Sequence, residues 1–248
     1  MDGKSRSARW GARIGLLAIL ILAAAIAANH LNLLGYEMPL AGLAAAALLG
    51  LIAVVLSLAG LIGVLRGRHG GAAAILGIVL GVIAAAPVGS TFVLGRGVPR
   101  IHDITTDLAN PPQFVLVVGL RKGAPNSLDR ATPPDLADQQ KKAYPDLVTL
   151  TLDEPPSKVY MAALATAKDM GWTLDGSTPE KGLIEATAVT KLIGFKDDVA
   201  IRITEKDGGS AVDLRSVSRV GVSDLGANAK RIRALLDALK TRLASQGS

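Results

Sequence analysis

The sequence predicts an α-helical membrane anchor of three transmembrane helices followed by an α+β domain. Three observations lead to this fold class. Long runs of Leu, Ala, Ile and Val fill residues 14–95, which hold only three acidic or basic side chains. From residue 96 onward the composition is that of a water-soluble domain, and after Tyr144 strand-like and helix-like patterns follow one another regularly. We therefore expect an anchor over residues 1–95 and a separate domain over residues 96–248.

The anchor is long enough for three crossings. A helix needs about 20 mostly apolar residues to span the roughly 30 Å hydrocarbon core of a bilayer. Three segments reach this length, at about residues 12–33, 40–65 and 71–94. Only Arg66, Gly67, Arg68 and His69 separate the apolar runs of the last two, so these helices must be antiparallel neighbours. The Gly77-Ile-Val-Leu-Gly81 spacing allows close helix packing, either within one three-helix bundle or between two copies of the chain.

Positive charges predict the orientation of the anchor. The N-terminal tail holds four Lys or Arg residues and the turn after the second segment holds two, whereas residues 29–39 hold none. Short cytoplasmic loops carry the excess of Lys and Arg, so the N-terminus is predicted to be cytoplasmic. Three crossings then predict a multi-pass inner-membrane protein with an extracytoplasmic domain, periplasmic in a bacterium with two membranes. Alternatively, the first segment with Ala25-Ile-Ala27 is a cleaved signal peptide, which leaves the domain outside as well.

Charge and composition argue against several functional classes. The chain carries a net charge of +6, but from residue 96 onward 21 Lys and Arg oppose 19 Asp and Glu. A domain this close to neutral has little support as a nucleic-acid binder. The chain has no cysteine and three scattered histidines, so disulfides, thiol nucleophiles, metal sites and cofactors are not expected. The expected partners are the lipid bilayer and another membrane or envelope protein.

The domain begins with an irregular segment in which seven prolines lie between residues 96 and 145. Its apolar residues, among them Ile101, Ile104 and Leu108, favour an extended segment that wraps the domain over a free linker. Residues 114–120 form the one apolar run in this segment, and we expect them to be a strand.

Regular structure is predicted after this segment. A helix is expected to begin at Pro155-Pro156-Ser157, with Ser157 as its N-cap, and to end just before Gly171. The other expected elements are strands at about 147–152, 172–174, 183–190, 199–205 and 211–218 and a second amphipathic helix at about 224–244. This order resembles TATA-binding-protein-like or helix-grip folds, in which an antiparallel sheet packs on two helices.

The expected strands have one apolar and one polar face. Val199, Ile201 and Ile203 share a face of one strand, and Val212 and Leu214 share a face of the next, because side chains alternate along a strand. The opposite face carries Glu185, Thr187, Arg202, Thr204, Asp213 and Arg215. We expect the helices on the apolar face and solvent, or a partner, on the polar face.

The first candidate site lies in residues 101–114, which contain His102, Asp103 and Asp107. A His102 base oriented by an aspartate would suit hydrolysis. No G-x-S-x-G or S-x-x-K motif accompanies these residues, however, and turns closed by Asp and Thr side chains explain the same composition.

Two further stretches are candidate sites. Asp197 and Asp198 would form an acid–base pair only if the strand begins after them, because consecutive strand residues point to opposite faces; a turn with exposed charges is the alternative. The loop after the last strand leads into a helix whose free amides, with Arg219, would bind an anion. The alternative is that Ser223 or Asp224 caps this helix.

Five phrases of the sequence resemble the bacterial domain of unknown function 1499 family. They are IHDITTD at 101–107, NPPQF at 110–114, AYPD at 143–146, GFKDDV at 194–199 and SRVGVSDLGANA at 218–229. The similarity covers essentially residues 98–243. It implies a domain of bacterial membrane-anchored envelope proteins and some plastid proteins, with no reaction attached to it. The motif residues in this chain are His102, Asp103, Asp107, Asp197, Asp198, Arg219, Ser223, Asp224 and Asn228.

These observations favour a non-enzymatic membrane protein whose external domain binds an envelope component or a membrane partner through the polar sheet face and the adjoining loops. One alternative is an envelope hydrolase that uses His102 with an aspartate. The other is a binder of lipid or another hydrophobic ligand, which needs a cavity of about 300 Å³ or more between the sheet and its helices.

Overall fold

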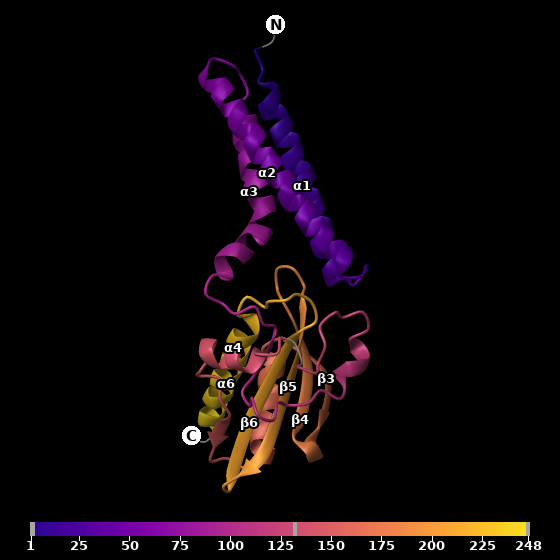
Figure 1. Cartoon of the computed structure of the whole chain (residues 1–248), viewed down its shortest axis with the longest axis vertical. Coiled ribbons are helices and arrows are strands. Elements are labelled where there is room, and N and C mark those ends of the chain that lie inside the picture. Colours follow the sequence, from indigo (N-terminus) through magenta and orange to yellow (C-terminus); the bar gives the residue numbers. More distant parts are fainter. Residues whose placement is uncertain (1–2, 131–132, 247–248) are drawn as a thin grey trace. The chain divides into compact units, whose positions relative to one another are not determined.

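The computed structural model describes residues 3–130 and 133–246 and divides into two compact units (Figure 1). One comprises the chain up to Arg96 together with Leu192–Gly194, and the other comprises Gly97–Lys191 and Phe195–Ser248. A helical anchor is thus followed by an α+β domain, as the sequence predicts.

The first unit is formed by three helices, α1 (Arg6–His30), α2 (Glu37–Leu65) and α3 (Gly71–Leu94), and each contacts the other two. All three are long and apolar enough to cross a membrane. The first helix begins earlier than the expected span because Ser5 caps it: the Ser5 hydroxyl accepts a hydrogen bond from the backbone N–H of Ala8 at 3.3 Å.

Glycines allow the three helices to approach closely. A methyl group added at Gly81 would lie 2.5 Å from the Gly50 carbonyl oxygen, and one added at Gly77 would lie 2.1 Å from the Ser57 hydroxyl. Both glycines of the Gly77-x-x-x-Gly81 spacing therefore face α2 of the same chain. This is the packing within one bundle that the sequence allowed.

The second unit contains an antiparallel sheet with the strand order β1-β6-β5-β4-β3, in which β3 to β6 are neighbours in the order of the chain. Two short strands, β1 and β2, pair with different parts of the same edge of β6. The strands are β1 (Asp103–Thr105), β2 (Leu150–Leu152), β3 (Thr173–Thr178), β4 (Leu183–Val189), β5 (Lys196–Lys206) and β6 (Gly209–Ser218).

Two helices, α5 (Pro156–Asp169) and α6 (Ala227–Gln246), cover the apolar face of the sheet, as predicted. The space between them and the sheet is filled by a cluster of buried side chains, including Val199, Ile201 and Leu235. The helix-grip cavity that a hydrophobic ligand requires therefore has no support. The expected N-cap Ser157 is wrong: Pro155 precedes the helix, because Pro156 lacks an N–H and suits the first helical turn.

The polar face of the sheet is covered, which corrects the expectation that it meets solvent or a partner. Glu185, Asp198 and Arg215 are at most 1% exposed. The segment between β1 and the short helix α4 (Leu136–Ala143) lies over them and makes hydrogen bonds to all three. The prediction that this irregular segment wraps the domain is therefore confirmed, whereas α4 and β1 were not predicted.

The strand expected at residues 114–120 is also wrong. Residues Val117–Leu120 form a 3-10 turn, η1, and a second 3-10 turn, η2 (Pro179–Lys181), links β3 to β4. The apolar run does not pair with a strand because its backbone N–H groups donate to the side chain of Glu185 instead.

Candidate functional site

We call the buried charged side chains between the sheet and the covering segment the polar layer. Its first cluster is centred on Asp103, at the start of β1. Arg215 of β6 donates to both carboxylate oxygens, Nε to Oδ1 at 3.1 Å and Nη2 to Oδ2 at 2.7 Å. Arg130 donates to the same carboxylate from the covering segment. Arg215 also lies over the ring of Phe114, 5.1 Å from its centroid, and donates to the carbonyls of Pro112 and Leu128, so the covering segment is attached both to one face of this guanidinium and to its N–H groups.

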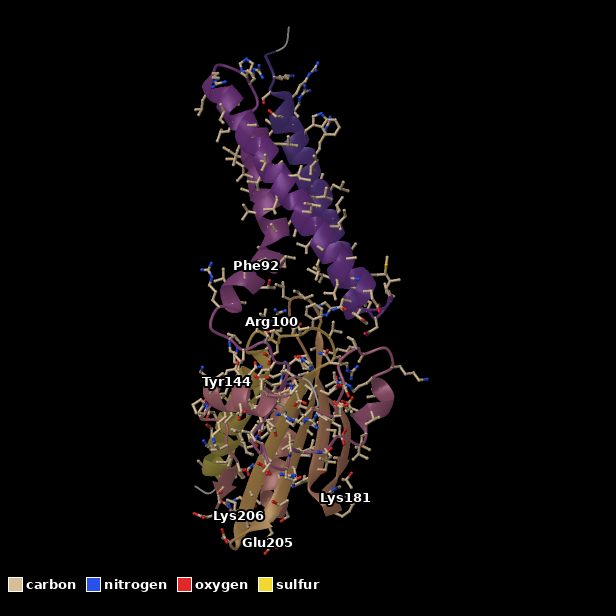
Figure 2. All side chains as sticks on the ribbon, viewed as in Figure 1. Phe92, Arg100, Tyr144, Lys181, Glu205 and Lys206 are labelled. Carbon is tan, nitrogen blue, oxygen red and sulfur yellow. The ribbon has the colours of Figure 1, made fainter. Side chains whose placement is uncertain are left out.

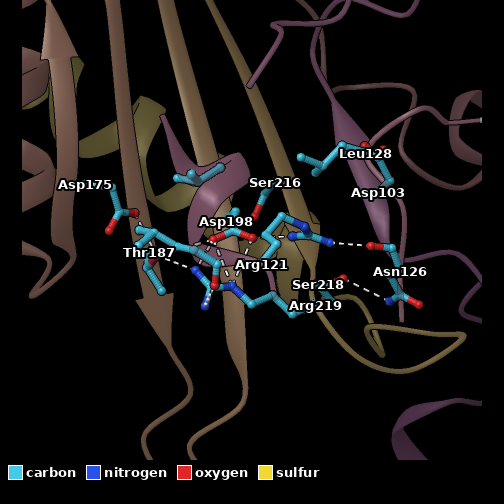
Figure 3. A network of polar contacts seen from close by, with 12 residues as sticks. Asp103, Arg121, Asn126, Leu128, Asp175, Thr187, Asp198, Ser216, Ser218 and Arg219 are labelled. Atoms are coloured by element: carbon cyan, nitrogen blue, oxygen red, sulfur yellow. Dashed lines mark hydrogen bonds and ion pairs between the residues drawn. The ribbon is translucent and has the colours of Figure 1, made fainter. Parts of the chain in front are cut away.

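The second cluster is centred on Asp198 of β5 and is shown in Figure 3. Arg219 donates from Nη2 to Oδ1 at 2.7 Å, and Arg121 pairs with Oδ2. Thr187 of β4 bonds to this carboxylate and to Asp175, whose pKa is raised by burial. Each of the two central aspartates is therefore held by two guanidinium groups, a geometry that compensates a buried carboxylate.

Glu185 of β4 anchors the covering segment through its backbone. Its Oε1 accepts from the N–H of Val115 at 2.7 Å, and its Oε2 accepts from those of Leu116 and Val117, both at 2.9 Å. Three successive amides thus converge on one buried carboxylate, an arrangement that satisfies donors which would otherwise be orphaned.

Asp107 lies in a third cluster, where Arg202 bridges it to Asp213 with two contacts of 2.9 Å. The other oxygen of Asp107 accepts from the backbone N–H groups of Ala109 and Asn110, at 3.1 and 2.9 Å. This is the Asx-turn role that the composition of the segment suggested.

The remaining motif residues support the start of α6. Asp224 accepts from the N–H groups of Gly226 and Asn228, both at 2.9 Å, so its carboxylate occupies the position that an external anion would take. Asn228 in turn donates to the His102 carbonyl at 3.0 Å and accepts from the hydroxyl of Ser216. Ser223 donates to the Pro99 carbonyl at 3.4 Å.

Asp197 and Asp198 are not the turn with exposed charges that we expected. Both are buried inside β5 and point to opposite sides of the sheet: Asp198 enters the polar layer, and Asp197 pairs with Arg231 of α6 at 2.5 Å. They therefore do not form an acid–base pair either. Their charges are tolerated inside the domain because each meets a guanidinium on its own side.

A cavity of about 260 Å³ opens beside β1. His102, Asp103 and Arg130 line it, together with residues 125–127, Asp129 and Val222. Within residues 3–130 and 133–246, His102 Nδ1 and Arg130 Nη2 are buried polar atoms without a hydrogen-bond partner. Burial lowers the pKa of His102, although Asp103 and a hydrogen bond to the backbone of Val222 oppose this, so the ring favours its neutral form.

The geometry does not supply the dyad that the hydrolase alternative requires. Asp103 is bound by Arg130 and Arg215, and Asp107 is bound by Arg202 and two backbone amides. Neither carboxylate is left to orient His102, whose ring instead interacts with the Val222 backbone. A histidine base needs such an orienting partner to hold the correct tautomer.

Arg121 and Arg130 are site residues that the sequence reasoning missed. Both lie in the irregular segment, and their partners Asp198 and Asp103 are 77 and 27 positions away along the chain. The one available signal was that two arginines occur in a segment already inferred to wrap the domain. Arg130 also has a left-handed backbone, φ 58°, which non-glycine residues seldom adopt and which is often found at functional sites.

The match to known proteins covers the sheet and its helices. A family model described as "Protein of unknown function (DUF1499)" matches residues 103–239, from the start of β1 to within α6. The comparison with curated proteins gave no match. The matched region contains all of the motif residues except His102, which directly precedes it.

Proposed function

We propose that this chain, which belongs to the DUF1499 family of proteins of unknown function, has a non-enzymatic binding role at the membrane. The α+β domain binds a small anionic group, a carboxylate or a phosphate, in the cavity beside β1. The ligand is part of an envelope component, and no bond of it is broken. The polar sheet face is not the binding surface, because the covering segment occupies it.

The observation that carries this proposal is the unpartnered guanidinium edge of Arg130. Its Nη1 donates to Asp103, whereas its Nη2 is buried without an acceptor in the described part of the chain, and the residue lines the cavity. An unsatisfied donor on a charged group costs more than an ordinary lost hydrogen bond. An anion in the cavity would remove this cost by accepting from Nη2, a planar donor suited to carboxylate and phosphate oxygens.

The charges around the cavity balance one another. Asp103 is shared by Arg130 and Arg215, which leaves one positive charge in this cluster, and Asp129, which also lines the cavity, offsets it. The neutral His102 ring beside it accepts or donates at Nδ1, depending on its tautomer. The cavity volume suits one small group, and not a whole lipid or peptide.

Titration of the full chain in detergent with inorganic phosphate and with acetate tests the binding proposal. We expect either anion to shift the ring resonances of His102, and Arg130→Gln to weaken binding at least tenfold, as loss of a charged hydrogen bond of about 1.5–3 kcal/mol predicts. Arg233→Gln is the matched control, since Arg233 pairs with Asp146 away from the cavity. If neither anion shifted the ring resonances of His102, the proposal would be contradicted.

The same proposal places the domain in the periplasm of a bacterium with an inner membrane. It is supported by the three span candidates and by the Lys and Arg residues of the N-terminal tail and the α2–α3 turn. The domain is then positioned to meet envelope components and not cytoplasmic ones.

Thiol labelling of intact cells tests this location, because the chain has no cysteine of its own. A membrane-impermeant maleimide is expected to modify Lys206→Cys, in the exposed β5–β6 hairpin, without cell lysis. Arg68→Cys, in the α2–α3 turn, is expected to react only after lysis. The opposite pattern would place the domain in the cytoplasm.

A further inference from the structure

At one end of the sheet, several loops lie around the point where the chain enters the second unit. We call this end of the sheet the entry end. The register pairs Val189 with Lys196 and Asp103 with Val217, so the end of β4, the start of β5, the start of β1 and the end of β6 all lie there. Figure 2 shows Arg100 at this end of the domain and Lys206 at the other.

The entry end carries exposed aliphatic side chains from three separate segments. Leu120 is 53% exposed and is held there by a hydrogen bond from Arg219 to its carbonyl at 3.3 Å. Val222, in the loop after β6, is 62% exposed, and Val189, the last residue of β4, is 43% exposed. Val118, within η1, is 55% exposed. Several exposed apolar side chains on the loops of one end of a domain are typical of surfaces that meet a partner or a membrane.

These side chains are held outward by the fold. The N–H groups of Val115, Leu116 and Val117 are fixed on Glu185 and Val117 is fully buried, so Val118, the next residue of η1, points away from the core, and the carbonyl of Leu120 is fixed by Arg219. Their exposure is therefore a consequence of well-anchored backbone and not of a loose loop.

Basic side chains accompany the aliphatic ones. Arg100 and Lys122 are exposed, and the residue after Arg100 and the residue before Lys122 are both bound at the entry end. The Ile101 carbonyl accepts from the backbone N–H of Asp224, and Arg121 pairs with Asp198. Aliphatic side chains bordered by Lys and Arg are the composition that binds the interface of an anionic bilayer.

The length of the connection favours the bilayer as the partner of the entry end. The span candidate α3 ends at Leu94 and β1 begins at Asp103, so eight residues join them. From Leu94 to Asp103 the chain makes nine Cα–Cα steps, which extend at most about 30–32 Å. If α3 crosses the membrane, the start of β1 is held within that distance of the end of α3, whatever the orientation of the domain.

We propose that the entry end rests on the lipid surface, with Val118, Leu120, Val189 and Val222 in the interfacial region and Arg100 and Lys122 among anionic headgroups. The domain is then oriented by a second, non-covalent attachment to the membrane that already holds its anchor. This inference rests on the exposed side chains and the connection, and Val222 is the residue that it shares with the lining of the cavity.

Nitroxide labels on single cysteines of the full chain test it, in vesicles of phosphatidylcholine and phosphatidylglycerol that contain no other protein. Labels at Leu120→Cys and Val222→Cys are expected to collide more with lipid-soluble oxygen than with a water-soluble nickel complex. Two controls are expected to show the reverse: Met161→Cys on α5, an apolar residue that is 63% exposed, and Lys206→Cys at the far end.

Equal behaviour of the Leu120 and Met161 labels would overturn the proposal and would leave the aliphatic side chains as a surface for another protein. A second measurement uses a label at Val118→Cys. Adding Leu120→Asp and Val222→Asp, both at exposed positions where the fold is not disturbed, is expected to return this label to water. A Val118 label that remains in lipid despite both charges would also contradict the proposal.

Discussion

Replacing Glu185 with leucine is expected to lower the free energy of unfolding of the α+β domain by about 3–5 kcal/mol, because three backbone amides lose their acceptor at once. Each buried, unsatisfied donor costs about 1–3 kcal/mol, and detachment of the covering segment would hydrate some of them at the cost of exposing Val117. Urea unfolding of the full chain in detergent measures this, with Trp10→Phe leaving the buried Trp172 as the single tryptophan reporter.

Two variants accompany this measurement. Glu185→Gln keeps one carbonyl acceptor and is expected to cost less than the leucine variant. Glu205→Leu, at an exposed position of β5, is expected to change the stability by no more than about 0.5 kcal/mol. A loss below about 1 kcal/mol for Glu185→Leu would show that the three amides do not depend on this carboxylate.

Replacing Asp103 with leucine is expected to cost about 3–5 kcal/mol, the typical result of leaving a buried charge without its partner. Arg215 is 1% exposed and would keep only carbonyl acceptors, those of Pro112 and Leu128. Arg130 would lose the same carboxylate. The urea experiment with Trp172 fluorescence measures this change as well.

The double variant Asp103→Leu with Arg215→Met separates the charge from the packing. It is expected to recover part of the lost stability, because the uncompensated guanidinium is removed together with its partner. Asp146→Asn is the surface control: its pair with Arg233 is largely exposed and is expected to contribute no more than about 1 kcal/mol. If the Asp103 variant behaved like this control, the polar layer would not stabilise the fold.

Elements with a periodic pattern could be predicted from the sequence. The three apolar helices follow from length and hydropathy, and the alternation of Val199, Ile201 and Ile203 identified the buried face of β5. These signals are local, because each residue is selected by the solvent or core that its own backbone position meets.

The polar layer could not be predicted in the same way. Alternating charges such as Glu185 and Arg215 are what a solvent-facing strand also shows, so no local pattern records that the wrapping segment covers this face. The apolar run at residues 114–120 has the pattern of a strand for a related reason. Its partner is a side chain of β4 and not another backbone, which no local pattern records.

The sequence by itself determined the three apolar spans, the antiparallel sheet with its two helices and the positions of the family motifs. Only the tertiary structure decided that the charged side chains of the sheet are buried and that Asp197 and Asp198 point to opposite faces of it. The tertiary structure also decided that Arg130 and His102 line the same cavity. The physical reason is that hydropathy is a property of each residue in its own segment. The state of a charge depends instead on which distant side chain folding brings to it.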